Sequence, residues 1–168
     1  MAQALSGWGR YPVVSADERC SEDLPAITRD VVLTRGLGRS YGDASLPLDF
    51  DSRLACSVLA DRVLGFDAET GVLRAEAGLS LAEIIRLFLP RGFFMPVTPG
   101  TKHVTLGGAV ASDVHGKNHH VAGSLGRFVR SLRLYVCAKR CASLRTRCRS
   151  RRAALMRARR NGSERPTR

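Results

Sequence analysis

The sequence predicts an α+β domain, and three observations support this prediction. Short apolar runs rich in Val and Leu recur between residues 31 and 136, and they have the length of strands. Residues 80–89 instead have the apolar spacing of a helix. Two glycine-rich segments each follow a short apolar run, an arrangement typical of ligand-binding loops that leave the ends of strands.

The predicted elements follow one another along the chain. Residues 1–16 lack periodicity and are expected to form an extended lead-in. A short helix, weakened by Pro25, is expected next. It covers residues 17–28. A turn at 67–71 separates two runs that predict a hairpin. The predicted strands up to this point are 31–34, 54–59, 63–66 and 72–77.

The helix after Gly78 has the clearest start and stop signals. Ser80 and Glu83 have the spacing of a capping box, in which each side chain satisfies a backbone N–H of the first turn. Pro90 and Gly92 end the helix. One face is apolar, formed by Leu81, Ile84, Ile85, Phe88 and Leu89. An apolar lead-in at 93–97, a small helix and a final strand at 129–136 complete the predicted domain.

The two glycine-rich segments are the strongest functional signals. Residues 35–43 read RGLGRSYGD, and residues 99–120 read PGTKHVTLGGAVASDVHGKNHH. Glycine permits positive φ and close approach of a ligand to the backbone, and several N–H groups turned into one concavity hold an anion. Because the second segment also runs into a His/Lys/Asn cluster, the pair predicts a dinucleotide bound along its length.

Charge is unevenly distributed along the chain. Residues 137–168 hold 12 of the 27 Lys and Arg residues and one of the 15 acids, so the remainder of the chain is almost neutral. This segment has no strand pattern and no aromatic residue. It is predicted to be a disordered arginine-rich tail or the product of out-of-frame translation. The alternative is a basic tail that binds nucleic acid without sequence preference.

The remaining bulk properties exclude several classes of protein. No run approaches the roughly 20 apolar residues of a membrane span, and no signal peptide is visible, so a cytoplasmic location is expected. The five cysteines have no regular spacing, which favours a reducing compartment over a disulfide framework. Cys137, Cys141 and Cys148 lack a fourth ligand in register, so no structural zinc site is predicted.

Three motifs together resemble a known family. GRSYGD, the AGLSLAEI helix and PGTKHVTLGGAVASDVHGKNHH are similar to the flavin domain of the vanillyl-alcohol-oxidase superfamily, and within it to the decaprenylphosphoryl-ribose 2′-oxidase and aldonolactone oxidase groups. The resemblance covers residues 5–136. It implies a two-subdomain FAD-binding domain of the PCMH type, here at 17–136. It also implies that the domain is incomplete at its C-terminus, because family members continue into a substrate domain.

The resemblance implies roles for particular residues. The backbone of residues 34–44 would wrap the FAD diphosphate, His115 would lie beside the isoalloxazine, and Lys117 would reach the substrate. His115 and Lys117 are therefore the candidate catalytic residues. The candidate cofactor-binding residues are Arg35, Gly36, Gly38, Arg39, Ser40, Tyr41, Gly42, Asp43, Gly100, Thr105, Gly107, Gly108 and His115.

The implied chemistry is hydride transfer from a CH–OH group of a sugar or sugar lactone to flavin N5. Members with covalent FAD often carry histidine where this chain has Arg39, so non-covalent FAD is expected, with Arg39 paired to a phosphate. The chain is expected to be inactive alone because it lacks a substrate domain.

Simpler interpretations of the same residues stay open. Glycine-rich loops are often only turns, and Lys117 could be a solvated surface lysine. His115, His119 and His120 could form a metal site, although Asp113 is the only carboxylate near them in sequence.

Overall fold

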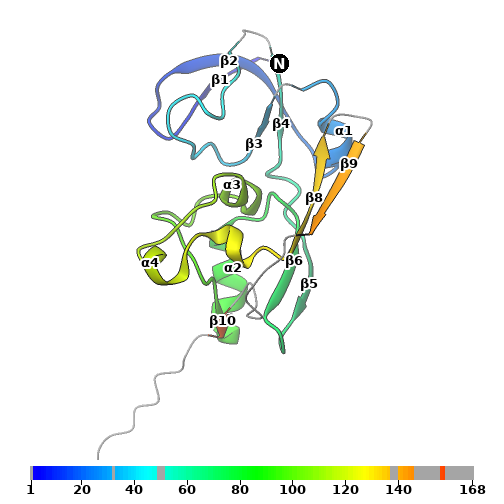
Figure 1. Ribbon diagram of the computed structural model, residues 1–168. Helices are drawn as coiled ribbons and strands as arrows, with labels where there is room; N and C mark the ends of the chain where they lie inside the picture. Colours follow the sequence, from blue (N-terminus) through cyan, green and yellow to red (C-terminus); the bar gives the residue numbers. More distant parts are fainter. Residues whose placement is uncertain (1, 32, 49–51, 137–139, 146–155, 158–168) are drawn as a thin grey trace, which may run out of the picture.

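Figure 1 shows the protein as a computed structural model, which describes residues 2–31, 33–48, 52–136, 140–145 and 156–157. A four-stranded sheet forms the upper part in this view, and most of the helices lie in the lower part. Each part has its own cluster of buried apolar residues, one around Leu54 and one around Leu81. The prediction of a mixed helix and strand domain with two subdomains is therefore confirmed.

The upper sheet contains the N-terminal strands. Its members are β1 (Gln3–Ser6), β2 (Val13–Cys20), β3 (Leu33–Arg35) and β4 (Arg53–Cys56). Their order is β1-β2-β4-β3, with β1 antiparallel to β2 and the other two pairs parallel. Leu5, Ala16, Leu46 and Leu54 are buried on it. The strands expected near 31–34 and 54–59 are confirmed with shifted bounds.

The expectations for the first 28 residues are corrected. Residues 1–16 contain β1 and the start of β2 and are not a lead-in without structure. The helix expected at 17–28 is reduced to α1 (Leu24–Ile27), whose N-cap Asp23 accepts a hydrogen bond from the Ala26 N–H. Residues 17–20 pair with β4 instead, and pairing in the sheet overrides the weak local preference of these polar residues.

Cys20 and Cys56 occupy paired positions on the neighbouring strands β2 and β4. Their Cα atoms are 4.5 Å apart, and their sulfur atoms form a disulfide. The sequence analysis favoured a reducing compartment over a disulfide framework, and it did not predict this disulfide. Sequence spacing could not reveal the pair, because parallel pairing brings together residues 36 positions apart.

The first half of the lower part follows the prediction closely. The predicted hairpin consists of β5 (Val63–Asp67) and β6 (Val72–Ala75). Helix α2 (Leu81–Phe88) begins where Ser80 Oγ accepts a hydrogen bond from the Glu83 N–H at 3.1 Å. The one-turn helix η1 (Leu89–Arg91) then stops at Gly92, which has φ of 83°.

The second half of the lower part is built from short elements. They are β7 (Phe93–Phe94), α3 (Leu106–Ala111), α4 (His119–Ala122), η2 (Leu125–Phe128), β8 (Ser131–Val136), β9 (Arg140–Arg145) and β10 (Met156–Arg157). β8 pairs with β9, and β7 pairs with β10, both antiparallel. The expectation of a tail without strands therefore fails for β9 and β10. The rest of 137–168 lies outside the described residues.

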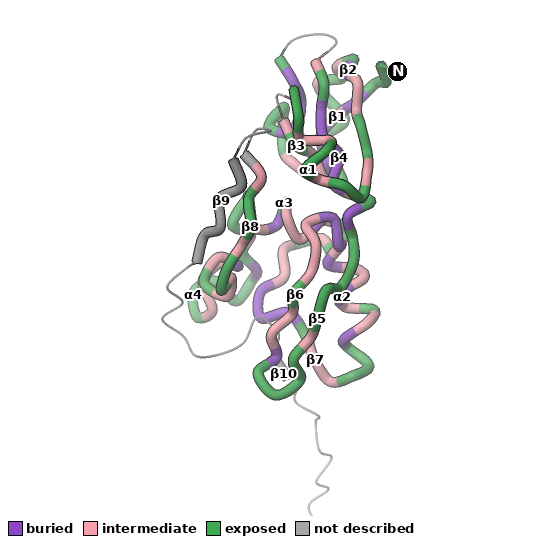
Figure 2. Tube along the Cα trace, turned by 90° about the vertical axis from the view of Figure 1, so that its right-hand side faces the viewer, coloured by how far each residue is buried: buried purple, intermediate pink, exposed green. Residues whose placement is uncertain are grey.

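Burial follows the two-part organisation. Figure 2 shows buried stretches inside the upper sheet and around α2, with exposed residues along the β5–β6 hairpin. The apolar face of α2 buries Leu81, Ile84 and Phe88, as the sequence spacing predicts. Leu89, which was predicted on the same face, lies in η1 and is exposed. Phe66 of β5 packs against Phe88 with ring centroids 4.6 Å apart. The hairpin therefore closes one side of the lower core.

Candidate cofactor-binding site

The first glycine loop, residues 36–43, leaves the end of β3 between the two parts of the molecule. Among the described residues, no backbone N–H from Leu37 to Asp43 donates a hydrogen bond. Three carbonyl oxygens of the same loop accept hydrogen bonds. The Leu37 oxygen accepts from Arg39 Nη1, the Ser40 oxygen from the Trp8 N–H, and the Asp43 oxygen from the Leu46 N–H. The loop therefore has spare donors and engaged acceptors.

Two glycines give this loop its shape. Gly38 has φ of 65° and Gly42 has φ of 58°, in the left-handed region that other residues rarely adopt. Alternation of left-handed residues with ordinary ones turns successive N–H groups to one side, which makes an anion-binding nest. The spare donors and the two left-handed glycines fit a diphosphate, so the residues present are suited to FAD.

The turn after β1 supports the first glycine loop from behind. A Cβ on Gly7 would lie 2.5 Å from the Gly42 carbonyl oxygen and 2.8 Å from that of Ser40, so only glycine permits this approach. The Trp8 N–H donates to the Ser40 oxygen at 2.9 Å. Sequence reasoning missed this supporting role, because it treated the first 16 residues as a lead-in.

The two arginines of the first motif have different surroundings. Arg39 is exposed; its guanidinium donates to the Leu37 oxygen at 3.0 Å and lies 5.4 Å from the Trp8 ring centroid. Arg35 is largely buried and faces the interior of the upper part, where Glu18 is 3.3 Å away. Pairing of Arg39 with a phosphate, expected from the sequence, can use the guanidinium N–H groups that do not bond to the Leu37 oxygen.

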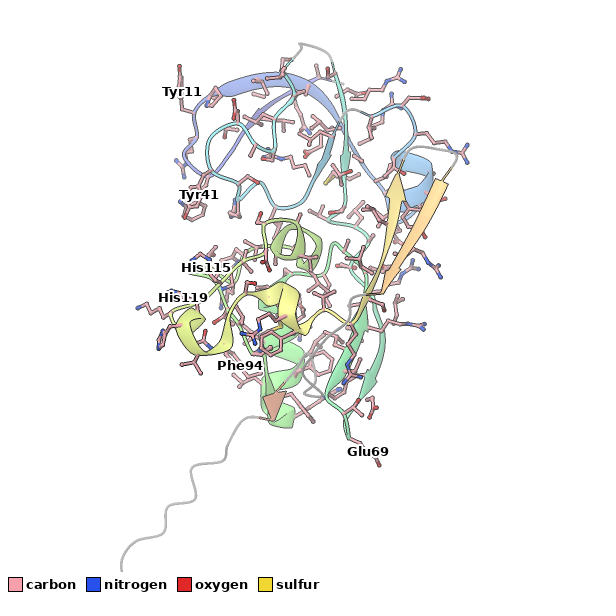
Figure 3. All side chains as sticks on the ribbon, in the orientation of Figure 1. Tyr11, Tyr41, Glu69, Phe94, His115 and His119 are labelled. Carbon is pink, nitrogen blue, oxygen red and sulfur yellow. A yellow bond between two sulfur atoms is a disulfide. The ribbon has the colours of Figure 1, made fainter. Side chains whose placement is uncertain are left out.

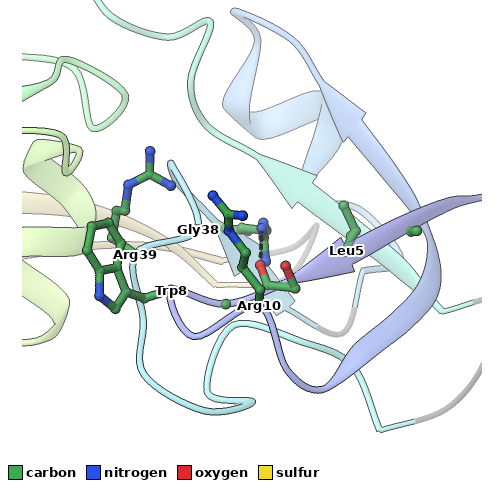
Figure 4. Close-up of a pocket in the computed structure, with 9 residues that line it drawn as sticks. Leu5, Trp8, Arg10, Gly38 and Arg39 are labelled. Carbon is green, nitrogen blue, oxygen red and sulfur yellow. Dashed lines mark hydrogen bonds between the residues drawn. The ribbon is translucent and has the colours of Figure 1, made fainter.

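A pocket of about 600 Å³ opens between the β1 turn and the first glycine loop. Figure 4 shows Trp8, Arg10, Gly38 and Arg39 around it. Three arginines and one aromatic ring on one hollow favour an anionic or planar ligand group. The full lining comprises Ala4, Leu5, Ser6, Gly7, Trp8, Arg10, Arg35, Gly38 and Arg39.

The second glycine segment, residues 99–120, differs from the first loop at its glycine pair. The Gly107 N–H donates to the Ala77 oxygen at 2.8 Å, and the Gly108 N–H donates to Thr105 Oγ1 at 3.1 Å. Thr105 is only 2% exposed. These residues were expected to contact the cofactor, but the Gly108 donor caps helix α3 and the Gly107 donor attaches the helix to Ala77, in the segment that follows β6. Gly100 is exposed.

The structure brings the two glycine segments into contact. A Cβ on Gly36 would collide with the Thr105 side chain, including its Oγ1. The first glycine loop therefore rests directly against the start of α3. This contact confirms that the two segments, 69 positions apart in the sequence between Gly36 and Thr105, border one region of the molecule.

The candidate catalytic residues lie on the exposed end of the second segment. His115 and Lys117 are exposed, and His115 bridges to Ser124 through an isolated backbone pair. In Figure 3, Tyr41 of the first glycine loop and His115 are on the same side of the molecule. Asn118 Nδ2 donates to the Pro96 oxygen at 3.1 Å and holds this end in place.

Asp113 orders the turn that precedes His115. It has positive φ, and its Oδ1 accepts a hydrogen bond from the Gly126 N–H at 2.7 Å. Hydrogen bonds from Ser124 and Gly126 lower the pKa of this carboxyl below its usual value. The charged form of Asp113 therefore links α3 to η2.

In the part of the chain that the structure describes, His115, His119 and His120 do not form a group of three ring nitrogens close enough to share an ion. The His115 and His119 ring centroids are 5.4 Å apart and the rings meet edge to face. Among the described residues, the one group of three donors close enough to share an ion is Glu18, Cys20 and Cys56. Its two sulfurs form the disulfide and Glu18 pairs with Arg35, so these groups already have partners.

Comparison with known families identifies the class of protein. Residues 25–139 match the FAD binding domain. The chain belongs to this family of FAD-binding domains, which is part of the vanillyl-alcohol-oxidase superfamily, and its cofactor is FAD. The sequence resemblance is thus confirmed.

Two curated proteins are similar to this chain in sequence. The chain is 39% identical over 145 residues to decaprenylphosphoryl-beta-D-ribose oxidase of Mycolicibacterium smegmatis, covering 77% of this chain and 30% of that protein. An uncharacterized protein of Streptomyces coelicolor is 48% identical over 56 residues, or 33% of this chain and 15% of that protein. The chain spans about a third or less of the length of these relatives.

Solved structures share the fold at low sequence identity. Cholesterol oxidase from B. sterolicum superposes with a TM-score of 0.67 at 13% identity, over 86% of this chain and 32% of the oxidase. An alkyldihydroxyacetonephosphate synthase gives 0.66 at 18% identity, over 82% and 30%. Within the described part of the chain, no helix is long and apolar enough to span a membrane.

Proposed function

We propose that this chain holds FAD non-covalently through the first glycine loop and forms the cofactor-binding part of an oxidoreductase that acts on CH–OH groups of a sugar or sugar lactone. The main support is the row of backbone donors from Leu37 to Asp43, which have no acceptor among the described residues. A diphosphate supplies acceptors of the required charge. When bound, FAD supplies the capacity to accept a hydride.

The choice of substrate class is supported by sequence identity. The Mycolicibacterium relative, 39% identical, is by its name an oxidase of a decaprenylphosphoryl-linked ribose. A secondary alcohol on a sugar ring is therefore the proposed substrate group. The nucleic-acid alternative depends on residues 137–168, most of which lie outside the described residues, and it is not proposed here.

Cofactor binding is tested by titrating the purified chain with FAD, riboflavin and ADP. FAD and ADP should compete for one site, whereas riboflavin, which lacks the phosphates, should bind at least about tenfold more weakly if charge-assisted hydrogen bonds hold the diphosphate. Equal affinity for riboflavin and FAD would contradict a diphosphate site in the first glycine loop. Acid precipitation should release all the flavin from the protein, as non-covalent binding requires.

We propose that His115 and Lys117 line the reactive side of the bound flavin. Both side chains are exposed and lie on the segment held by Asn118 and Asp113. A lysine cation there would stabilise the reduced, anionic flavin. Lys117→Ala should therefore make the midpoint potential of bound FAD more negative, and Lys102→Ala, an exposed lysine on the same segment, should not. Equal midpoint potentials of bound FAD in the two variants would show that Lys117 does not lie beside the flavin.

Inactivity of the chain on its own stays a prediction. It is tested by mixing the FAD-loaded chain, without oxygen, with aldonolactones and ribose derivatives. No loss of absorbance of oxidised flavin is expected. Bleaching by any of these compounds would contradict the prediction and would identify a substrate directly.

A further inference from the structure

Arg35 is a largely buried arginine at the end of β3, and it borders the pocket described above. Its side chain is 11% exposed, and that of Glu18, its ion-pair partner on β2, is 14% exposed. Arg35 Nη2 donates to the Ser6 oxygen at 2.7 Å, and Nη1 lies 3.4 Å from both the carbonyl oxygen and the Oγ of Ser45. All three nitrogens of the guanidinium therefore face protein acceptors.

These partners come from separate segments that surround the first glycine loop. Ser6 ends β1, Glu18 lies on β2, and Ser45 follows the loop two residues after its end. Arg35 itself directly precedes the loop. One side chain thus ties the two ends of the loop to each other and to two strands of the upper sheet.

The middle of the loop also rests on this guanidinium. Gly38 is buried, and a Cβ at this position would lie 2.8 Å from Arg35 Cζ. Gly38 is one of the two residues with positive φ that shape the nest. The Arg35 side chain therefore packs directly against the loop where it bends at Gly38.

We infer that Arg35 is a positioning residue for the diphosphate: it sets the shape of the first glycine loop and does not itself contact the phosphates. This inference rests on the proposed function of the loop. Glu18 neutralises most of the guanidinium charge, since its second oxygen is held by Gln3 Nε2 at 2.9 Å while the first faces Arg35. The planar fork of donors is therefore required, and a positive charge alone does not replace it.

The test compares Arg35→Lys with Arg35→Gln, using FAD and ADP as ligands. Lysine keeps the charge and loses the fork, and glutamine loses both. A positioning role predicts that both variants weaken FAD and ADP binding by a similar factor, about 30-fold or more, because several charge-assisted hydrogen bonds are lost. Arg53→Gln, an exposed arginine on the neighbouring strand β4, is the matched control and should change affinity less than about twofold.

Chemical rescue separates positioning from a general loss of structure. In Arg35→Ala, millimolar guanidinium should restore FAD affinity at least severalfold, whereas the same concentration of methylammonium should not. The folded fraction of each variant is measured by circular dichroism. If the Arg35 variants fail to fold, Ser45→Ala, which removes one acceptor of the guanidinium, is measured instead and should weaken FAD and ADP binding together.

The outcomes are distinct. If Arg35→Lys binds FAD like the wild type while Arg35→Gln does not, the charge acts directly on the phosphates and positioning is wrong. If all folded Arg35 variants bind FAD like the wild type, the loop does not depend on Arg35. The same conclusion follows if the Arg35 variants fail to fold and Ser45→Ala leaves FAD affinity unchanged. If the wild-type chain itself binds neither FAD nor ADP, the proposed function is wrong. The inference about Arg35, which rests on that function, then fails with it.

Discussion

The two glycine-rich segments look alike in sequence and differ in where their backbone donors go. In the first glycine loop, the N–H groups from Leu37 to Asp43 have no acceptor among the described residues. In the second, the N–H groups of Gly107 and Gly108 are bonded to Ala77 and Thr105. The proposed function gives the glycines of the first loop a role in ligand binding, whereas Gly107 of the second segment is closely packed against Ala77. The two segments are distinguished by whether each backbone N–H has an acceptor within the protein.

The largest expected effect concerns the sheet that carries the first loop. Replacing both Cys20 and Cys56 by serine should lower the free energy of unfolding by about 3–4 kcal/mol, as the entropy of closing a loop of this length predicts. Urea unfolding of the oxidised wild type and the double variant measures the difference. An equal midpoint for the two proteins would show that the disulfide contributes nothing to the upper part. The oxidised wild type treated with reductant should behave like the double variant.

Gly38→Ala should mainly affect FAD binding. A side chain at positive φ costs about 1–2 kcal/mol, and the added Cβ also meets the Arg35 guanidinium, so FAD affinity should fall at least about tenfold. The control is Gly65→Ala on β5, where φ is not positive and a Cβ meets nothing within 4 Å. Unchanged affinity in a folded Gly38→Ala protein would contradict the assignment of the loop.

Gly107→Ala should show the opposite pattern. The new Cβ would lie 2.9 Å from the Ala77 Cβ, so overpacking should lower the free energy of unfolding by about 1–2 kcal/mol. The affinity of the folded protein for ADP should stay within about threefold, since the Gly107 N–H already has a partner. Differential scanning calorimetry and ADP titration measure the two quantities. A large loss of ADP affinity without loss of stability would show that both glycine segments bind the diphosphate.

The smallest expected effect is the pH dependence associated with Asp113. Because hydrogen bonds lower its pKa in the folded state, its contribution to stability is present above the unfolded pKa near 3.8 and is lost as the pH falls through the folded value. Asp113→Asn should therefore lose part of the decline in stability seen in the wild type below about pH 4. Identical pH profiles for the two proteins would show that this carboxyl does not order the turn before His115.

The sequence predicted most of the fold where the signals are local. The N-cap at Ser80, the β5–β6 hairpin and most of the apolar face of α2 depend on residues that are close in sequence, and these were confirmed. The other half of the predicted capping box was not, because the Glu83 carboxylate accepts a hydrogen bond from Arg86 Nε. The errors fell where long-range pairing decides the structure. Residues 17–20 are a strand because β4 lies beside them, and Cys20 meets Cys56 for the same reason.

The candidate site was predicted in part, for a similar physical reason. The motif predicted a loop at residues 36–43, which the structure has, and the cofactor-binding role of this loop stays a prediction. The motif could not show that Arg35 faces inward while Arg39 is exposed. It also could not show that Thr105 is buried. Burial of a side chain depends on segments that are distant in sequence, here Ser6, Glu18 and Gly36.

The contact between Gly36 and Thr105 has a consequence for engineering and for evolution. Any side chain at position 36 would collide with Thr105, so the residues at these two positions constrain each other. A larger residue at either one is tolerated only with a compensating change at the other. Libraries that aim to alter cofactor preference should therefore randomise positions 36 and 105 together, and homologous sequences should show paired exchanges there.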